Sequence, residues 1–324
     1  MASKTYCWAL IDAIHEEMSR DETVVLLGED VAEAGGAFGA SRTLLESFGP
    51  RRVRDTPISE EIIVGLGVGA AMTGKRPIVE IMFMDFLGLC LDQIFNQAAK
   101  THYIYSGAFK MPLVIRTSTA VEMGIGPHHS QLLESWLGHV PGLKVVMPST
   151  PRDAKGLMKA AIRDDNPVVF IEHLAMHRVK EDIEDDDFVI PIGKADVKRK
   201  GRDVTVVATG LQVARALAAA DELAKDGIEI EVIDPRTISP LDIDTIVESV
   251  KKTNRALVVT SSLKPFGFGS EVSAEITERA FFHLDAPVAR LTPPFAPAPF
   301  GKKFDAWLNP NAESIAASVR SLLG

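Results

Sequence analysis

The residues of this sequence best suited to proton transfer are a carboxylate and an imidazole. Glu60 ends the segment Asp55-Thr-Pro-Ile-Ser-Glu60, and the glycine-rich run Gly65–Gly69 follows it. A carboxylate held at the mouth of a tightly packed α/β unit can lie in a low-dielectric environment, which raises its pKa and lets it exchange a proton with a bound cofactor. His129 begins the triplet His-Ser-Gln, and histidine is the residue type most often used as a general acid or base.

Each of these residues also has a simpler interpretation. A glutamate at the start of a helix is usually no more than a favourable partner for the helix dipole. A single histidine is more often structural or surface-exposed than catalytic. The case for chemistry therefore depends on the elements that surround Glu60 and His129.

The composition narrows the class of protein. The chain has 324 residues, enough for two domains, with 24% charged and 46% apolar residues as in ordinary globular proteins. A net charge of −9 argues against nucleic acid as a partner, because phosphate binding needs a basic surface. The apolar runs are too short and too often broken by charges to predict a membrane span. Cys7 and Cys90 are too few for a disulfide scaffold or a cysteine-ligated zinc site.

The N-terminal segment predicts a cytoplasmic protein. Residues 1–6 have neither the apolar core of a signal peptide nor an arginine-rich transit pattern. A mature organellar protein that has lost its presequence would look the same.

Alternation of strand-like and helix-like segments predicts an α/β fold with two domains and mainly parallel sheets. In the first half, short β-branched runs predict strands at 23–27, 77–81, 113–116, 144–147 and 168–171. Apolar residues at helical spacing predict helices at 6–20, 59–73, 86–99 and 152–163.

A concentrated acidic run at 181–187 predicts a solvated linker. The expected boundaries are a first domain over 1–180, an acidic linker over 181–200 and a second domain over 201–324. In the second domain we expect strands at 204–208, 228–233, 256–260 and 288–291, and helices at 213–225, 241–251, 270–280 and 312–323. The proline-rich stretch 293–299 cannot hold a regular strand ladder, so it predicts an extended arm that packs on its own body or on a neighbour.

These motifs together resemble the β subunits of thiamine-diphosphate-dependent 2-oxoacid dehydrogenases, over nearly the whole chain. The resemblance implies a transketolase-like pyrimidine-binding domain followed by a transketolase C-terminal-like domain. It implies oxidative decarboxylation of a 2-oxoacid, or the related cleavage of acetoin, with acyl transfer to lipoamide. The stretch 86–100 is closer to acetoin-type than to pyruvate-type β subunits. The expected order of substrates is therefore acetoin or pyruvate first, then branched-chain 2-oxoacids.

The resemblance also implies roles for individual residues. In that family the glutamate matching Glu60 hydrogen-bonds the ring nitrogen of the cofactor's aminopyrimidine and activates the cofactor. His129 is expected to carry out acid–base work while the acyl group passes to lipoamide. Phe86 would stack on the pyrimidine with Met82 beside it, although both also fit a role in the core. Glu29 follows a predicted strand and is expected to line the same pocket.

The sequence departs from the family pattern just before His129. The family commonly has Ala-Gln ahead of its histidine, whereas this chain has Pro127 and His128. The preceding stretch 117–123 also differs from the usual glycine-rich loop. These departures bear on the choice of substrate more than on the class of reaction.

The resemblance further implies a cation site and a partner. Residues 161–167 fit a potassium-binding stretch of the family, with expected ligands Leu113, Ala161, Ile162, Asp164 and Asn166. A capped helix end and a turn explain the same spacing equally well. The Gly-Asp-Gly segment that holds the diphosphate and Mg²⁺ in thiamine enzymes does not occur in this sequence. We therefore expect an α subunit to supply that half of the site in an α₂β₂ tetramer, which would acylate a lipoyl acyltransferase core.

Two other interpretations stay open at this point. Gly65, Gly67 and Ala70 satisfy the Gly-x-Gly-x-x-Ala fingerprint of NAD-dependent oxidoreductases. Residues 59–61, however, are more typical of a helix start than of the turn after a strand. The second alternative is a non-catalytic scaffold subunit of the same fold, against which the presence of both Glu60 and His129 argues.

Overall fold

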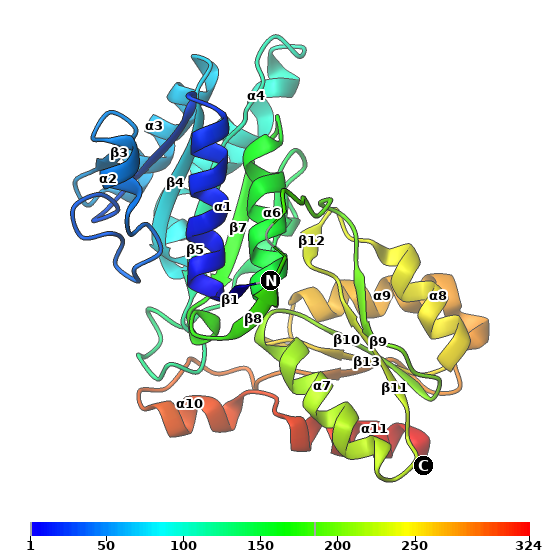
Figure 1. Ribbon diagram of the computed structural model, residues 1–324. Helices are drawn as coiled ribbons and strands as arrows, with labels where there is room; N and C mark the ends of the chain where they lie inside the picture. The colour runs from blue at the N-terminus through cyan, green and yellow to red at the C-terminus, as the bar shows by residue number, and fades with distance from the viewer. Residues whose placement is uncertain (1, 185) are drawn as a thin grey trace. The chain divides into compact units, whose positions relative to one another are not determined.

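The computed structural model describes residues 2–184 and 186–324, and it divides into two compact units (Figure 1). The first unit comprises residues up to 120 together with 136–192. The second unit comprises residues 121–135 together with 193–324. The sequence pattern places its break at 181–200 and gives no indication that 121–135 leaves the first unit.

Parallel strands form the centre of the first unit. Their order is β6-β7-β5-β4-β2-β3, and every neighbouring pair in this series is parallel. The strands are β2 (Val24–Gly28), β3 (Val53–Asp55), β4 (Arg76–Phe83), β5 (Val114–Thr119), β6 (Lys144–Val146) and β7 (Val168–His173). Strands β5 and β7 are buried along their whole length, as expected for a parallel sheet that is covered on both faces.

Helices cover this sheet, and α1 (Tyr6–Arg20) lies beside α6 (Pro151–Arg163) (Figure 1). The other helices are α2 (Leu44–Phe48), α3 (Glu60–Met72), α4 (Ala99–Ile104), α5 (Glu134–Gly138) and the 3₁₀ turn η3 (Leu174–Met176). The helix expected at 86–99 is wrong in type. A 3₁₀ segment, η1 (Met84–Cys90), and a π-helical segment, η2 (Gln93–Ala98), replace most of it.

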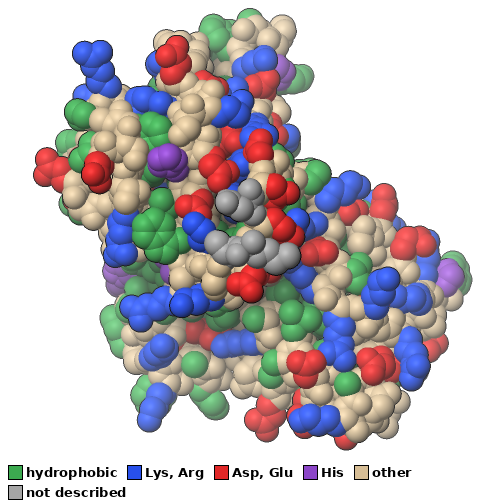
Figure 2. Space-filling view, in the orientation of Figure 1, with side chains coloured by type: hydrophobic (Ala, Val, Ile, Leu, Met, Phe, Trp, Pro, Cys, Tyr) green, Lys and Arg blue, Asp and Glu red, His purple; other side chains and the backbone are tan. Residues whose placement is uncertain are grey.

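The acidic run is only partly the linker that its composition predicts. Its first residues belong to β8 (Lys180–Ile183), which pairs antiparallel with β1 (Ala2–Thr5). Asp187 forms ion pairs with Lys159 and Arg163 of α6; Asp185 lies outside the described residues. Acidic and basic side chains are interspersed over the face that Figure 2 shows. These ion pairs of Asp187 attach the end of the run to α6.

Helix α3 excludes the dinucleotide-binding interpretation. Gly65, Gly67 and Ala70 all lie inside this helix, whereas the fingerprint must form the turn between a strand and a helix. The glycine at 67 serves packing, because a Cβ there would lie 2.7 Å from Val79 Cγ1 and 2.9 Å from Leu113 Cδ1. This close approach of α3 to the sheet explains the glycine-rich sequence without a nucleotide.

The second unit has a smaller sheet in the order β14-β13-β10-β11-β9. Its strands are β9 (Asp196–Arg199), β10 (Val204–Ala208), β11 (Ile230–Asp234), β13 (Ala256–Val259) and β14 (Ala289–Leu291), and β9 alone of these runs antiparallel to its neighbour. Helices α7 (Leu211–Ala224) and α11 (Ala312–Leu323) enclose an aliphatic core on one face. Helices α8 (Ile243–Thr253) and α9 (Phe268–Ala280) lie on the other (Figure 1).

The remaining elements of the second unit are short: β12 (Thr237–Ser239), the 3₁₀ turn η4 (Phe281–His283) and α10 (Lys302–Leu308). The proline-rich stretch packs on its own unit, where residues 293–298 line a cavity with residues of 121–133. Within the described part of the chain, no helix is long and apolar enough to cross a membrane.

Candidate active site

The carboxyl ends of three adjacent strands bring most of the expected site residues to one edge of the first sheet. In the order β4-β2-β3, Met82 lies near the end of β4, Glu29 directly follows β2, and Asp55 ends β3. Open parallel sheets bind their ligands outside this edge. We call the group formed by Glu29, Glu60, Met82 and Phe86 the carboxylate site, after its two glutamates.

The segment Asp55–Glu60 is fixed by backbone hydrogen bonds before the helix begins. The Asp55 carboxylate accepts the N–H groups of Ala32 at 2.7 Å and Glu33 at 3.2 Å. The Thr56 N–H donates to the Gly28 carbonyl at 2.9 Å. Glu60 then occupies the first position of α3, where the unpaired N–H groups and the helix dipole favour a negative charge.

The carboxylates of this site lie close enough to repel one another. Burial, followed by the negative charge of Glu60, raises the pKa of Glu29. Asp30 and Glu80 add to this shift with the same sign. Glu29 and Glu60 are both half-buried, so each keeps part of its surface accessible to a ligand. A ligand that donates hydrogen bonds to these oxygens would relieve the repulsion.

Met82 lies near the end of β4, and Phe86 lies in the 3₁₀ segment η1 that directly follows it. The pairing of β4 with β5 is irregular between Ile81 and Phe83, and such a bulge re-aims the side chain at that point. The Phe86 ring meets the Phe83 ring edge-on, with 5.7 Å between centroids. Because Met82 and Phe86 are half-buried, they are not simply core residues and keep surface for a flat ring.

The thiol near this site is inert. Cys90 is fully buried, and this burial, followed by the charge of Glu60, raises its pKa to about 12. A thiol with such a pKa carries almost no thiolate at neutral pH and is a poor nucleophile.

The side chains of the carboxylate site fit the aminopyrimidine half of thiamine diphosphate. Carboxylate oxygens of Glu29 and Glu60 can accept hydrogen bonds from ring and amino nitrogens, and Phe86 offers an aromatic face. Thr56 Oγ1 is buried and has no hydrogen-bond partner among the described residues, so it can serve a bound group. Within the described residues, no cluster of three or more His, Cys, Asp or Glu could hold a metal ion.

Beneath this edge runs a buried ionic network that the sequence pattern did not predict as a unit. Arg116 of β5, 2% exposed, donates to Glu80 of β4 at 2.9 Å and to Glu172 of β7 at 2.7 Å. His177 Nε2 lies 3.2 Å from the second Glu172 oxygen. The available signal was a charged residue inside each of three aliphatic strands. Arg116 and His177 hold the pKa of Glu172 low, whereas burial raises the pKa of Glu80, so the pairing of Arg116 and His177 with Glu172 is the ionic centre that makes burial of these charges tolerable.

The expected potassium ligands already have partners. The carbonyls of Ile162 and Asp164 accept from Arg76 at 2.8 and 2.6 Å. The Leu113 carbonyl accepts from the N–H of Val168 at 2.9 Å. The Asp164 carboxylate binds Lys144 at 2.5 Å. A monovalent cation would have to share these oxygens with the positive charge of Arg76, and the site stays a prediction.

The expected Asn166 and Ala161 contacts are local. The Asp164 carboxylate caps Asn166, accepting its backbone N–H at 2.9 Å and its side-chain amide at 2.9 Å. The Asp164 N–H in turn donates to the Ala161 carbonyl at 3.3 Å. These are the capped helix end and turn that the spacing also allows.

His129 belongs to the second unit, in an irregular segment that we call the histidine loop, residues 121–131. The His129 N–H donates to the Gly126 carbonyl at 3.3 Å and closes a turn. The imidazole of His129 is half-buried, whereas that of His128 is exposed. The carboxylate site lies in the first unit, so the structure groups Glu29 and Glu60 but assigns His129 to a different body.

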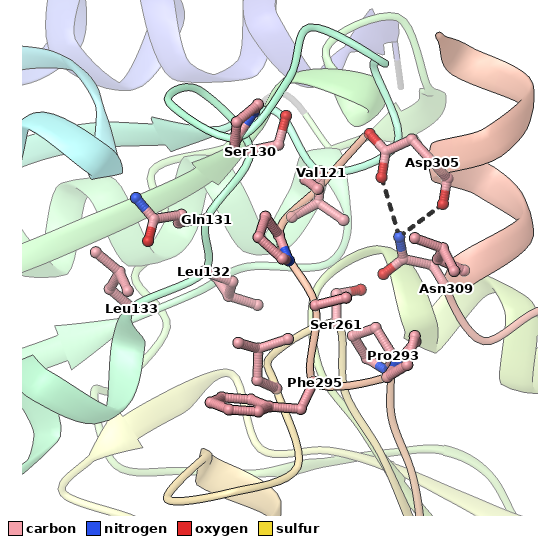
Figure 3. Close-up of a pocket in the computed structure, with 17 residues that line it drawn as sticks. Val121, Ser130, Gln131, Leu132, Leu133, Ser261, Pro293, Phe295, Asp305 and Asn309 are labelled. Atoms are coloured by element: carbon pink, nitrogen blue, oxygen red, sulfur yellow. Dashed lines mark hydrogen bonds between the residues drawn. The ribbon is translucent and has the colours of Figure 1, made fainter. Parts of the chain in front are cut away.

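A cavity of about 450 Å³ adjoins the histidine loop within the second unit (Figure 3). Its wall is mainly apolar and includes Leu132, Leu263 and Phe295. Ser130 Oγ and Asn309 Oδ1 on this wall are buried without a hydrogen-bond partner among the described residues. No motif of the sequence predicted this cavity, because residues far apart in the chain form it.

Comparison with known proteins assigns the N-terminal and the C-terminal part of the chain to known domain families. Family models of the transketolase pyrimidine-binding domain and the transketolase C-terminal domain match residues 3–178 and 193–315. The 2-oxoisovalerate dehydrogenase subunit beta of Bacillus subtilis is 46% identical and covers 99% of both chains. The pyruvate dehydrogenase E1 component subunit beta of Rhizobium meliloti is 44% identical over 99% of this chain and 70% of its own length. The acetoin:2,6-dichlorophenolindophenol oxidoreductase subunit beta of Cupriavidus necator is 43% identical, covering 97% and 96%.

Proposed function

We propose a function from the premise that this chain belongs to the β subunits of thiamine-diphosphate-dependent 2-oxoacid and acetoin dehydrogenases. The chain supplies the pyrimidine half of the active site, and an α subunit supplies the other half. Together they cleave a 2-oxoacid or acetoin and pass the acyl group to a lipoyl group on an acyltransferase core. The observation that carries this proposal is Glu60 at the start of α3, electrostatically coupled to Glu29 at the edge of the sheet.

Glu60 holds and shares a proton with the cofactor. When bound, thiamine diphosphate supplies the nucleophilic carbon and the electron sink that bond cleavage beside a carbonyl requires. The Glu60 carboxylate hydrogen-bonds the protonated ring nitrogen of the aminopyrimidine and keeps the proton available there. The helix N-terminus stabilises its negative charge, and Glu29, whose pKa is raised, stands beside it as a second acceptor. Phe86 and Met82 hold the ring in place.

His129 serves the second half-reaction. An imidazole can act as both acid and base, so it can protonate the sulfur that leaves when the S–S bond of the lipoyl ring breaks, and it can take up the proton that is released as the thioester carbonyl forms. Its loop lies in the C-terminal unit, which separates cofactor activation on one body from acyl transfer on the other. His128, which is exposed, is not assigned a role in this step.

The α subunit provides what this chain lacks. Thiamine enzymes hold the diphosphate and Mg²⁺ through a Gly-Asp-Gly segment that is absent here. The names of the three relatives describe β subunits, which supports a heteromeric enzyme. We propose an α₂β₂ tetramer in which Mg²⁺ is bound mainly by α. Potassium at Asp164 stays a secondary part of the proposal.

Acetoin and pyruvate stand first as substrates, followed by branched-chain 2-oxoacids. The stretch 86–100 favours this order. The relatives named for 2-oxoisovalerate, pyruvate and acetoin are 46, 44 and 43% identical, and such differences are too small to choose between them. The substrate pocket also includes residues of the α subunit, so the choice is a property of the assembled enzyme.

The test is purification of the chain with its stoichiometric partner, followed by calorimetric titration with thiamine diphosphate and Mg²⁺. We expect the pair to bind the cofactor and the isolated chain to bind it poorly. The pair is then assayed with pyruvate, acetoin and 2-oxoisovalerate, using 2,6-dichlorophenolindophenol as electron acceptor. Sub-micromolar binding by the isolated chain would refute the split site. A partner without Gly-Asp-Gly would refute the proposed subunit division.

A further inference from the structure

The histidine loop begins with a charge clamp. Glu122 is 5% exposed, and both of its carboxylate oxygens accept from the guanidinium of Arg215 on α7, one of them at 2.6 Å. The same guanidinium donates to the carbonyl of Pro310. Glu122 has a φ of 69°, a left-handed conformation that is unfavourable for a residue with a side chain. The bidentate pair of Glu122 with Arg215 therefore stabilises a backbone conformation that is unfavourable by itself.

A second clamp follows two residues later. Asp305 of α10, 2% exposed, accepts the N–H of Gly124 at 3.0 Å. The Gly301 N–H donates to the Gly124 carbonyl at 2.9 Å, so both backbone polar groups of Gly124 are bound. Asn309 in turn donates its side-chain amide to the Asp305 carbonyl at 3.0 Å and to its carboxylate at 3.3 Å (Figure 3).

The backbone of the histidine loop packs directly against residues 300–302, which precede and begin α10. A Cβ at Gly124 would be 2.2 Å from the Lys302 nitrogen, and one at Gly126 would be 2.3 Å from the Phe300 ring. Ile125 forms an antiparallel bridge with Phe300. Gly126 is also the residue whose carbonyl accepts the His129 N–H. The clamps thus end one turn before the imidazole.

We infer that Glu122, Arg215 and Asp305 are positioning residues for His129. They fix the start of a loop that has no strand or helix to hold it, and thereby set where the imidazole stands during acyl transfer. This inference rests on the role proposed above for His129. Misplacement of an acid–base group by about 1 Å can cost on the order of 100-fold in rate. The clamp is therefore a part of acyl transfer and not only a source of stability.

The experiment compares two reactions of the assembled α–β enzyme. The first is dye reduction with 2,6-dichlorophenolindophenol, which needs the carboxylate site but no lipoyl group. The second is acylation of free lipoamide, with whichever of pyruvate, acetoin or 2-oxoisovalerate the wild type turns over. We expect Arg215→Met to lose at least about ten-fold more in lipoamide acylation than in dye reduction. The loss should appear in kcat more than in KM.

Matched variants separate positioning from folding. Arg215→Lys keeps the charge but loses the fork, so it should recover part of the acylation rate. Arg320→Met removes an ion pair to Asp226 in the same unit, 2.7 Å long and exposed, and should affect the two reactions equally. If Arg215→Met does not assemble, Glu122→Gln, which keeps the side-chain volume, replaces it with the same expectation.

The outcomes are decisive in either direction. Equal losses in both reactions, or no loss in either, would overturn the inference while leaving the proposed function intact. A wild type that reduces dye but never acylates lipoamide would overturn the role of His129, and the inference with it. A selective loss that Arg215→Lys partly restores supports the inference.

Discussion

The carboxylate site and the histidine loop position their functional side chains by different means. Glu29 follows a strand and Glu60 begins a helix, so regular backbone hydrogen bonds set their places. His129 lies on an irregular segment that is held by side chains from far along the chain, including Arg215 and Asp305. The first arrangement is built from local structure and the second from long-range polar contacts. The two sites should therefore respond differently to substitution.

Glu60→Gln should give the largest effect, because it removes the proton acceptor on which both half-reactions depend. We expect turnover to fall by about 10²–10⁴-fold in dye reduction and in lipoamide acylation alike. The unfolding midpoint should change little, because the charge of half-buried Glu60 at the helix start contributes at most about 1 kcal/mol.

Glu61→Gln is the matched control for this variant. Glu61 is the next residue of the same helix and is exposed, so turnover should stay near that of the wild type. If Glu60→Gln keeps its activity in the assembled enzyme, the scaffold interpretation would replace the catalytic one.

Arg116→Met should cause the largest loss of stability in the first unit. It leaves the carboxylates of Glu80 and Glu172 buried without their guanidinium, and breaking such a network costs about 3–5 kcal/mol. Urea unfolding of the isolated chain measures the loss. Lys110→Met is the control, because its pair with Asp165 is exposed and should contribute less than about 1 kcal/mol. Equal losses of unfolding free energy in Arg116→Met and Lys110→Met would show that the buried network does not specially stabilise the strands that carry this site.

The sequence predicted the parts of the fold that depend on periodicity. The helix at 6–20, the strand at 204–208 and the helix at 312–323 have the expected bounds. Strands β1 and β9 were not predicted, because short antiparallel edges carry little pattern. The expected helix at 86–99 failed because its apolar spacing does not distinguish α from 3₁₀ or π geometry.

The same distinction applies to the sites. The place of Glu60 at the start of a helix could be predicted because its motif is continuous in the sequence. The contact of Glu122 with Arg215 joins residues 93 positions apart, and that of Gly124 with Asp305 joins residues 181 apart. Neither pair forms a pattern that can be read along the chain. Long-range polar contacts of this kind require the fold.

His129→Ala should produce a smaller and more selective effect than Glu60→Gln. Lipoamide acylation should fall by about 10²-fold, whereas dye reduction should fall much less, because only acyl transfer needs the imidazole. His128→Ala is the control: this neighbour is exposed and should leave both rates near the wild type. Equal losses in the two reactions after His129→Ala would contradict a division of labour between the carboxylate site and the histidine loop.

The smallest expected effect is on the pH dependence of stability in the first unit. Burial alone would lower the pKa of His177, but hydrogen bonds with Cys7 and Glu172 and their charges raise it to about 9. Burial alone would raise the pKa of Glu172, but Arg116 and His177 lower it to about 2. The stability that protonated His177 contributes is complete below its ordinary value of about 6.5 and disappears as the pH rises through 9. The contribution of ionised Glu172 is complete above 4.5 and disappears toward pH 2.

Urea unfolding between pH 6 and pH 8.5 follows the histidine, because the buried Cys90 thiol lowers stability only above about its ordinary pKa of 9.0. We expect the free energy of unfolding to fall by about 1–3 kcal/mol over this range in the wild type, because the folded chain keeps the His177 proton that the unfolded chain loses. His177→Gln should reduce the value at pH 6 and remove most of the fall. His102→Gln, at an exposed position of the same unit, should leave the slope unchanged. If His177→Gln keeps the wild-type slope of unfolding free energy against pH, a group other than His177 titrates over this range. The ionic pairing of Glu172 with His177 would then contribute little to holding the strands that carry Glu29 and Met82.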